Sequence, residues 1–169
     1  MSTSGSTRSG LDLPSRDELL RIVGFVVLVN LVGGAAAVIG GPGSEWFLAL
    51  EKPWFYPPGW AFGVVWTLLF SLLGVALYRV WRADESGERR VALGAFALQM
   101  VFNVAWTPAF FGAQNPGLGL AVIAVLWVLV VATIWAFRRV DRPAAALLVP
   151  YLLWVSFAAV LNYDIWRLN

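Results

Sequence analysis

The chain has 169 residues, of which 60% are apolar and 13% are charged, and its mean hydropathy is +0.74. Soluble domains are roughly half apolar and a quarter charged, so this balance indicates an integral membrane protein of one domain. The sequence contains no Cys and no His, and its formal net charge is +2. Disulfides, thiolate metal sites and histidine acid–base chemistry are therefore excluded. We expect no metal site, no cofactor and no nucleic-acid partner.

Five apolar runs divide the chain. Residues 1–18 are rich in Ser, Thr and Gly and predict a disordered polar tail. The run at about 19–40 is long enough to cross a bilayer, which takes roughly 20 residues. Further runs of this kind lie at about 60–81, 91–111, 117–137 and 144–166. The sequence therefore predicts an all-α membrane protein, a five-transmembrane-helix bundle over residues 19–169 with a long first loop.

The first loop, residues 41–59, differs from an ordinary connection between spans. It contains prolines that break helices, yet it also carries five aromatic residues within 46–56. This aromatic surface favours a loop that folds back over an apolar part of the bundle. Residues 44–50 predict a short helix capped by Ser44. Pro108 and Pro150 fall inside predicted spans, where we expect a kink or a first helical turn.

The basic residues predict the orientation of the bundle. Ten of the twelve Lys and Arg residues lie on the side of the N-terminus, and only Lys52 and Arg167 lie on the other. The positive-inside rule therefore places the N-terminus in the cytoplasm, and it places the C-terminus and the first loop outside. All ten acidic residues lie in the tail, the loops or the helix ends. This absence of a mid-membrane charge argues against ion-coupled transport.

Ten tryptophans are several times the ordinary usage. Anchoring or packing is the favoured explanation for four of them, Trp81, Trp127, Trp135 and Trp166. The other six are expected to converge on one cavity, where flat indole faces favour flat aromatic ligands. These six are Trp46, Trp54, Trp60, Trp66, Trp106 and Trp154.

Amide side chains interrupt the apolar spans at Asn30, Gln99, Asn103 and Asn162. Each needs a hydrogen-bond partner in lipid, and bonding between helices is the default explanation. Asn103 stands three residues before Trp106 on the same helical face, so it favours a cavity wall instead. There it is expected to orient a ligand carbonyl or carboxylate.

Four stretches together resemble the tryptophan-rich sensory protein / translocator protein (TspO/MBR) family, also called the peripheral-type benzodiazepine receptor family. They occur in order over about residues 20–169: LEKPW with PPGWAFGVVW (50–66), LQ with NVAW (98–106), FFG (110–112), and PYLLW with FA and LNYDIWRLN (150–169). Val64 departs from the family, where Pro often follows the Phe-Gly pair, and leaves the start of the second span less fixed.

The resemblance implies a five-helix bundle whose first loop closes a ligand pocket, often in a homodimer within membrane lipid. Family members bind porphyrins such as protoporphyrin IX and related flat hydrophobic ligands, and animal members bind cholesterol. Residues 161–167 match a loose cholesterol-contact pattern, but many helix ends match it by chance. The implied pocket residues are Trp54, Trp66, Asn103, Trp106, Trp154 and Ala158.

Three functions stay open at this point. The first is a membrane receptor or sensor that binds porphyrins, and the lack of His and Cys favours a metal-free porphyrin over haem. The second is light-dependent degradation of protoporphyrin IX, because Trp66 and Trp154 match the tryptophans implicated in that reaction in some bacterial relatives. The third is transport of tetrapyrroles or lipids.

Overall fold

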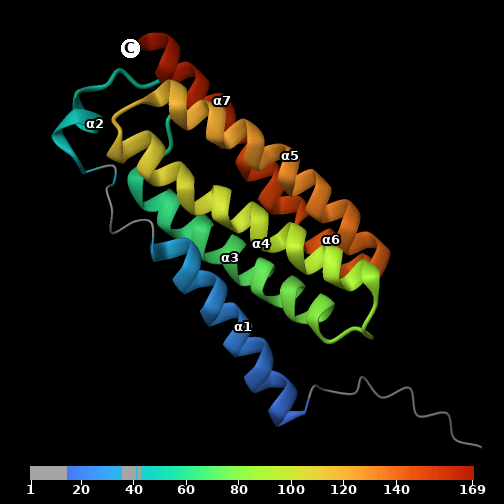
Figure 1. Ribbon diagram of the computed structural model, residues 1–169. Coiled ribbons are helices and arrows are strands. Elements are labelled where there is room, and N and C mark those ends of the chain that lie inside the picture. Colours follow the sequence, from blue (N-terminus) through green and yellow to red (C-terminus); the bar gives the residue numbers. More distant parts are fainter. Residues whose placement is uncertain (1–14, 36–40, 42) are drawn as a thin grey trace, which may run out of the picture.

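The computed structural model describes residues 15–35, 41 and 43–169, and this part of the chain forms helices and no strand (Figure 1). In chain order the helices are α1 (Arg16–Ala35), α2 (Glu45–Ala49), α3 (Gly59–Trp81), α4 (Gly87–Thr107), the π-helix η2 (Pro108–Gly112), α5 (Pro116–Val140), α6 (Arg142–Leu147) and α7 (Val149–Leu168). Among the described residues, five segments are long and apolar enough to cross a membrane: α1, α3, α4 with η2, α5, and α6 with α7. The predicted fold class is confirmed.

Helices α1 and α4 begin earlier than the apolar runs because polar capping residues start them. Ser15 accepts a hydrogen bond from the backbone N–H of Glu18 (3.2 Å), so α1 begins at Arg16 and includes the last three residues of the predicted tail. Residues 1–14 of that tail and residues 36–40 of the predicted first span lie outside the described residues. Ser86 accepts from Arg89 N–H (3.1 Å) and starts α4 within the charged connection.

Two prolines change the helical hydrogen-bond pattern, as expected. Pro108 begins η2, in which Ala113 N–H donates to the carbonyl of Pro108 at 2.8 Å, five residues back. Pro150 lies in the first turn of α7 and has no N–H to donate to the preceding turn. The last predicted span is consequently two helices, α6 and α7, which meet at Leu148.

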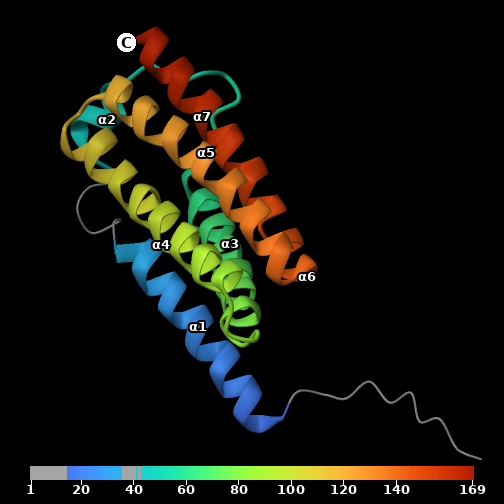
Figure 2. The same ribbon diagram turned by 45° about the vertical axis from the view of Figure 1, so that its right-hand side comes forward.

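The bundle has a packed half and a hollow half. The packed half surrounds the end of α3, the start of α4, the end of α5 and all of α6, and its largest fully buried side chains include Leu73, Phe137 and Leu148. The opposite half, where α3 and α7 meet the first loop, contains a large cavity. Two views show α2 at this end of the bundle (Figures 1 and 2).

Helix α1 lies at the edge of the bundle and packs mainly on α3 (Figure 2). Of its residues only Val29 is buried, so most of its surface faces the surroundings of the bundle. Gly74 permits the close approach of the two helices. A Cβ atom at this position would lie 2.5 Å from the Cα atom of Val26 and 2.9 Å from the carbonyl oxygen of Phe25.

We expect Gly74→Ala to lower the melting temperature of the protein in detergent. The added methyl group meets backbone atoms of α1 that cannot rotate away, and overpacking of this kind costs about 1–3 kcal/mol. Thermal unfolding followed by circular dichroism measures the effect.

Gly94→Ala is the matched control. A Cβ atom there has no neighbour within 4 Å, so this variant keeps the gain in helix propensity without a clash. Equal melting temperatures for the two variants would show that α1 does not pack on Gly74 as described.

Candidate functional site

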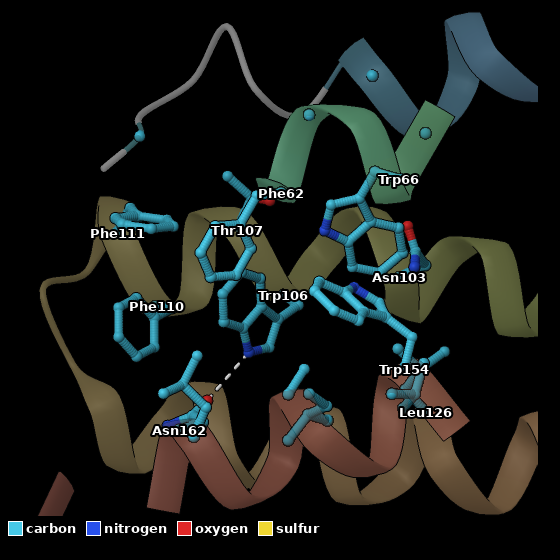
Figure 3. A pocket seen from close by; sticks show the side chains of 18 of the residues that line it. Phe62, Trp66, Asn103, Trp106, Thr107, Phe110, Phe111, Leu126, Trp154 and Asn162 are labelled. Atoms are coloured by element: carbon cyan, nitrogen blue, oxygen red, sulfur yellow. Dashed lines mark hydrogen bonds between the residues drawn. The ribbon is translucent and has the colours of Figure 1, made fainter. Parts of the chain in front are cut away.

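A cavity of about 420 Å³ lies in the hollow half of the bundle. This volume is within the range of small-molecule sites, about 300–1,000 Å³. Its walls come from α1, α3, α4, η2, α5 and α7, and the first loop closes it through Phe47 and Tyr56. Figure 3 shows side chains from several of these elements pointing toward one space.

Aromatic rings form most of the cavity wall. Trp66 on α3 and Trp154 on α7 meet edge to face, with ring centroids 6.4 Å apart and planes at 88°. Phe62 packs against Trp154 at 5.9 Å, and Trp106 stacks on Phe110 at 5.0 Å (Figure 3). These rings present both faces and edges to the cavity, an arrangement suited to aromatic ligands.

The structure brings five of the six implied pocket residues together. They are Trp66, Asn103, Trp106, Trp154 and Ala158. Their part in ligand binding stays a prediction.

Trp54 departs from its expected position, because it does not line the cavity. Tyr56 N–H donates to the carbonyl of Pro53 (3.0 Å) and closes a turn, with Trp54 and Phe55 at its two central positions. Phe55 packs against Phe157 at 6.2 Å, and Trp54 projects away with 95% of its surface exposed.

The convergence expected for six tryptophans holds for three of them. Trp60 is 72% exposed because it lies on a different side of α3 from the face that carries Phe62 and Trp66. Trp46 belongs to the first loop and packs on Phe110 of η2, with ring centroids 5.7 Å apart. The four tryptophans assigned to anchoring or packing do not line the cavity.

The buried amides lie at or near the cavity and link helices. Asn103 donates to the Tyr151 hydroxyl (2.9 Å), which donates to Gln99 Oε1 (3.0 Å). Asn162 accepts from the Trp106 indole N–H at 3.0 Å and donates to the carbonyl of Pro116 at 2.7 Å (Figure 3). Asn103 and Asn162 therefore line the cavity and also join helices.

Two buried polar atoms have no hydrogen-bond partner among the described residues, Trp154 Nε1 and Gln99 Nε2. A buried donor left in this state costs about 1–3 kcal/mol. The Trp154 indole belongs to the cavity wall. Its nitrogen is itself buried, so the ring would have to turn before a ligand acceptor could reach the N–H.

Phe110 and Phe111 also line the cavity wall, which the sequence pattern does not predict for either residue. The sequence feature that indicates an irregular wall here is Pro108, which lies inside an otherwise helical run. The wider turn of η2 places the two rings 4.9 Å apart, and the ring of Phe47 from the first loop lies 6.0 Å from Phe110 and 5.1 Å from Phe111. The wall and the first loop are thus joined by aromatic contacts.

We call residues 43–58 the lid. The predicted short helix is confirmed as α2, and the Ser44 hydroxyl accepts the N–H of Phe47 at 3.3 Å. Lys52 closes the other end of α2 by donating to the carbonyls of Phe47 (2.8 Å) and Leu50 (3.0 Å). Burial raises the pKa of the Tyr56 phenol above its ordinary value, so this hydroxyl is neutral at physiological pH.

A side chain at the end of α7 holds the lid in place. Asn169 accepts from the backbone N–H of Glu51 (2.9 Å) and donates to the carbonyl of the same residue (3.1 Å). Its amide also donates to the carbonyl of Ile165 at 2.9 Å, which fixes its orientation. The lid is therefore tied to α7 by a two-point amide contact.

Comparison with known proteins gives one family. Residues 23–167 match the TspO/MBR family. The chain is 44% identical to the tryptophan-rich sensory protein of Cereibacter sphaeroides, over 75% of this chain and 78% of that protein. It is 40% identical to the translocator protein of Ovis aries, over 87% of this chain and 89% of that protein. It is 38% identical to the tryptophan-rich protein TspO of Archaeoglobus fulgidus, over 90% and 99% of the respective chains.

We expect Asn169→Ala to loosen the lid. Loss of both hydrogen bonds to Glu51 should speed amide hydrogen exchange across residues 45–56 by about tenfold, since each bond contributes about 0.5–1.5 kcal/mol. Exchange read by mass spectrometry checks this result.

Arg167→Ala is the control for that experiment. Its side chain is 65% exposed, and among the described residues its ion-pair partner is Asp164, within α7. Exchange in the lid should stay at the wild-type rate. Similar acceleration in both variants would mean that the helix end frays without a specific contribution from the Asn169 amide.

Proposed function

This chain belongs to the TspO/MBR family of membrane sensory and translocator proteins, and we propose that it is a receptor that binds porphyrins and related flat hydrophobic ligands in the cavity under the lid. The observation that carries the proposal is the group of indole and phenyl rings from separate helices around one space of about 420 Å³. Burial of a planar aromatic molecule among such rings gains both apolar area and stacking contacts.

The Asn103 side chain offers a ligand a polar contact at the cavity wall. The Asn103 amide nitrogen is bonded to Tyr151 (2.9 Å), whereas its oxygen accepts no hydrogen bond from the described residues. This oxygen suits a hydrogen-bond donor at the rim of a ligand, such as the O–H of a protonated carboxyl group. The sequence has no His and no Cys, the residues that most often ligate haem iron.

The proposal includes an orientation in the cell membrane. Arginines cluster at the end of the bundle where α1 and α4 begin and α3 and α5 end. The positive-inside rule assigns this end to the cytoplasm, so the lid faces the outside. A ligand would then reach the cavity from the outer side of the membrane.

We expect the double variant Trp66→Leu, Trp154→Leu to bind protoporphyrin IX about tenfold more weakly in the dark. Each lost indole contact removes roughly 0.5–1.5 kcal/mol beyond burial, while leucine preserves an apolar wall. Titration followed by the absorption band of the porphyrin measures the affinity.

Trp54→Leu is the matched control, because it removes an indole from the lid without touching the cavity. Its affinity should equal that of the wild type. If all three proteins bind the porphyrin equally well, the cavity is not the porphyrin site.

A second candidate function is light-dependent porphyrin degradation. Trp66 and Trp154 both line the cavity and lie within 6.4 Å of each other, so either indole is placed to donate an electron to a photoexcited ligand. Dioxygen would be the terminal oxidant of such a reaction. Binding and degradation share the cavity but differ in their response to light.

For this second function, we expect illumination to remove the porphyrin absorption band faster with the wild-type protein than with Trp66→Phe, Trp154→Phe. Phenylalanine keeps an aromatic wall for binding but is a much poorer electron donor than tryptophan. The decay of the band and the products, measured under air, report the reaction. Equal decay with the variant or with free tryptophan would exclude the enzyme and leave the receptor.

A further inference from the structure

A second hollow, distinct from the ligand cavity, lies at the arginine-rich end of the bundle. It has a volume of about 420 Å³ and is lined by Glu88, Trp135, Arg138, Arg139 and Arg142. These residues come from the first turn of α4, the last turns of α5 and the start of α6. We call this hollow the basic pocket.

The basic pocket carries an excess of positive charge. Three arginines and one glutamate give +3 − 1 = +2. The acidic partner is weakly engaged, because Glu88 lies 4.0 Å from the Arg139 guanidinium and both side chains are at least half exposed. Glu88 offsets the charge of Arg139, so the excess positive charge of the pocket is carried by Arg138 and Arg142.

No other acid in the described part of the chain neutralises the remaining two arginines. Neither Arg138 nor Arg142 forms an ion pair with a described residue. Asp141 lies between them in sequence, but its carboxylate is bound by Arg79 (3.0 Å) and accepts the N–H of Ala144 (2.8 Å) as the cap of α6. Two guanidinium groups are therefore available to an anion.

Trp135 positions the third arginine. The guanidinium carbon of Arg139 lies 3.7 Å from the centroid of the Trp135 ring, in a cation–π contact. This contact holds the planar guanidinium in place at the wall of the pocket. Arginine in a fixed plane presents paired N–H donors that match two phosphate oxygens.

The basic pocket adjoins an apolar stripe along α5. This stripe indicates that a phosphate bound in the pocket would belong to a lipid. Trp127, Val128, Val131 and Trp135 are 40%, 60%, 39% and 58% exposed. Their spacing places them along one face of the helix, which ends at the basic pocket. In a membrane-spanning bundle, an apolar stripe that ends in tryptophan and arginine marks the level of the lipid headgroups. Acyl chains can lie along the stripe while a headgroup occupies the pocket.

We propose that the basic pocket binds the headgroup of an anionic phospholipid, with its phosphate held by Arg138 and Arg142 beside Arg139 and its acyl chains along the exposed face of α5. Basic pockets at the ends of membrane helices, together with neighbouring apolar surface, are suited to such lipids. A zwitterionic phospholipid offers the same phosphate, but its positive choline opposes the net charge of the pocket. This site is independent of the cavity under the lid.

The test uses the full chain in a non-ionic detergent, titrated separately with phosphatidylglycerol, phosphatidylcholine and inorganic phosphate. Native mass spectrometry counts the bound lipid. We expect the wild type to prefer phosphatidylglycerol over phosphatidylcholine. The double variant Arg138→Gln, Arg142→Gln should bind phosphatidylglycerol about tenfold more weakly. Millimolar inorganic phosphate should not displace the bound lipid. Each single variant should lose about threefold, and the singles decide the question if the double variant does not fold.

The control is the double variant Arg16→Gln, Arg21→Gln, which removes the same number of positive charges at the same end of the bundle. It should bind phosphatidylglycerol within about twofold of the wild type, because exposed arginines on α1 lie outside the pocket. An equal loss of phosphatidylglycerol affinity in both double variants would show that net charge alone causes the effect, and it would overturn the proposal. Equal binding of the two lipids, or displacement by inorganic phosphate, would overturn it as well.

Discussion

A hydrocarbon environment offers no hydrogen-bond partner, so polar groups in the spans must find partners inside the protein. This constraint accounts for the side-chain hydrogen bonds within the membrane-spanning segments. Hydroxyls of Thr67, Thr133 and Ser156 donate to carbonyls four residues back in their own helices. The longer amide and indole groups reach other helices instead, as Trp106 does to Asn162. The bonds of Asn103 to Tyr151 and of Trp106 to Asn162 lie at the cavity, so they connect helices where the aromatic side chains gather.

The division of the bundle into a packed half and a hollow half follows from side-chain size. Alanines such as Ala76, Ala92 and Ala144 are fully buried where the helices pack closely at the arginine-rich end. Toward the other end, Trp66, Trp106 and Trp154 replace them, and these large rings hold the backbones apart without filling the space between. Glycines on α3 enlarge the space further. A lid rich in aromatic residues covers the opening, because phenyl rings of α2 and η2 pack together there.

Hydropathy and helical spacing were sufficient to predict the five spans and the inward positions of Asn103 and Trp106. Both signals repeat along a helix, so a residue's direction follows from its neighbours. The lid has no such period. Trp54 and Phe55 are adjacent aromatic residues with almost the same composition around them, yet one projects outward and the other packs on α7. The contact of Asn169 with Glu51 likewise joins residues far apart in sequence and leaves no local pattern. Helices α1 and α4 begin before the apolar runs because Ser15 and Ser86 cap them, and hydropathy alone does not detect a polar cap.

The π-helical turn at residues 108–112 makes the cavity sensitive to the length of the chain as well as to its chemistry. A bond that spans five residues accommodates one more residue than an α-helical turn does. Removal of that residue would restore ordinary helical geometry and rotate the following side chains by about 100°. Phe110 and Phe111 would then exchange their present neighbours for others without any change in residue type. Relatives that differ here by one inserted or deleted residue would present a differently shaped wall to their ligands.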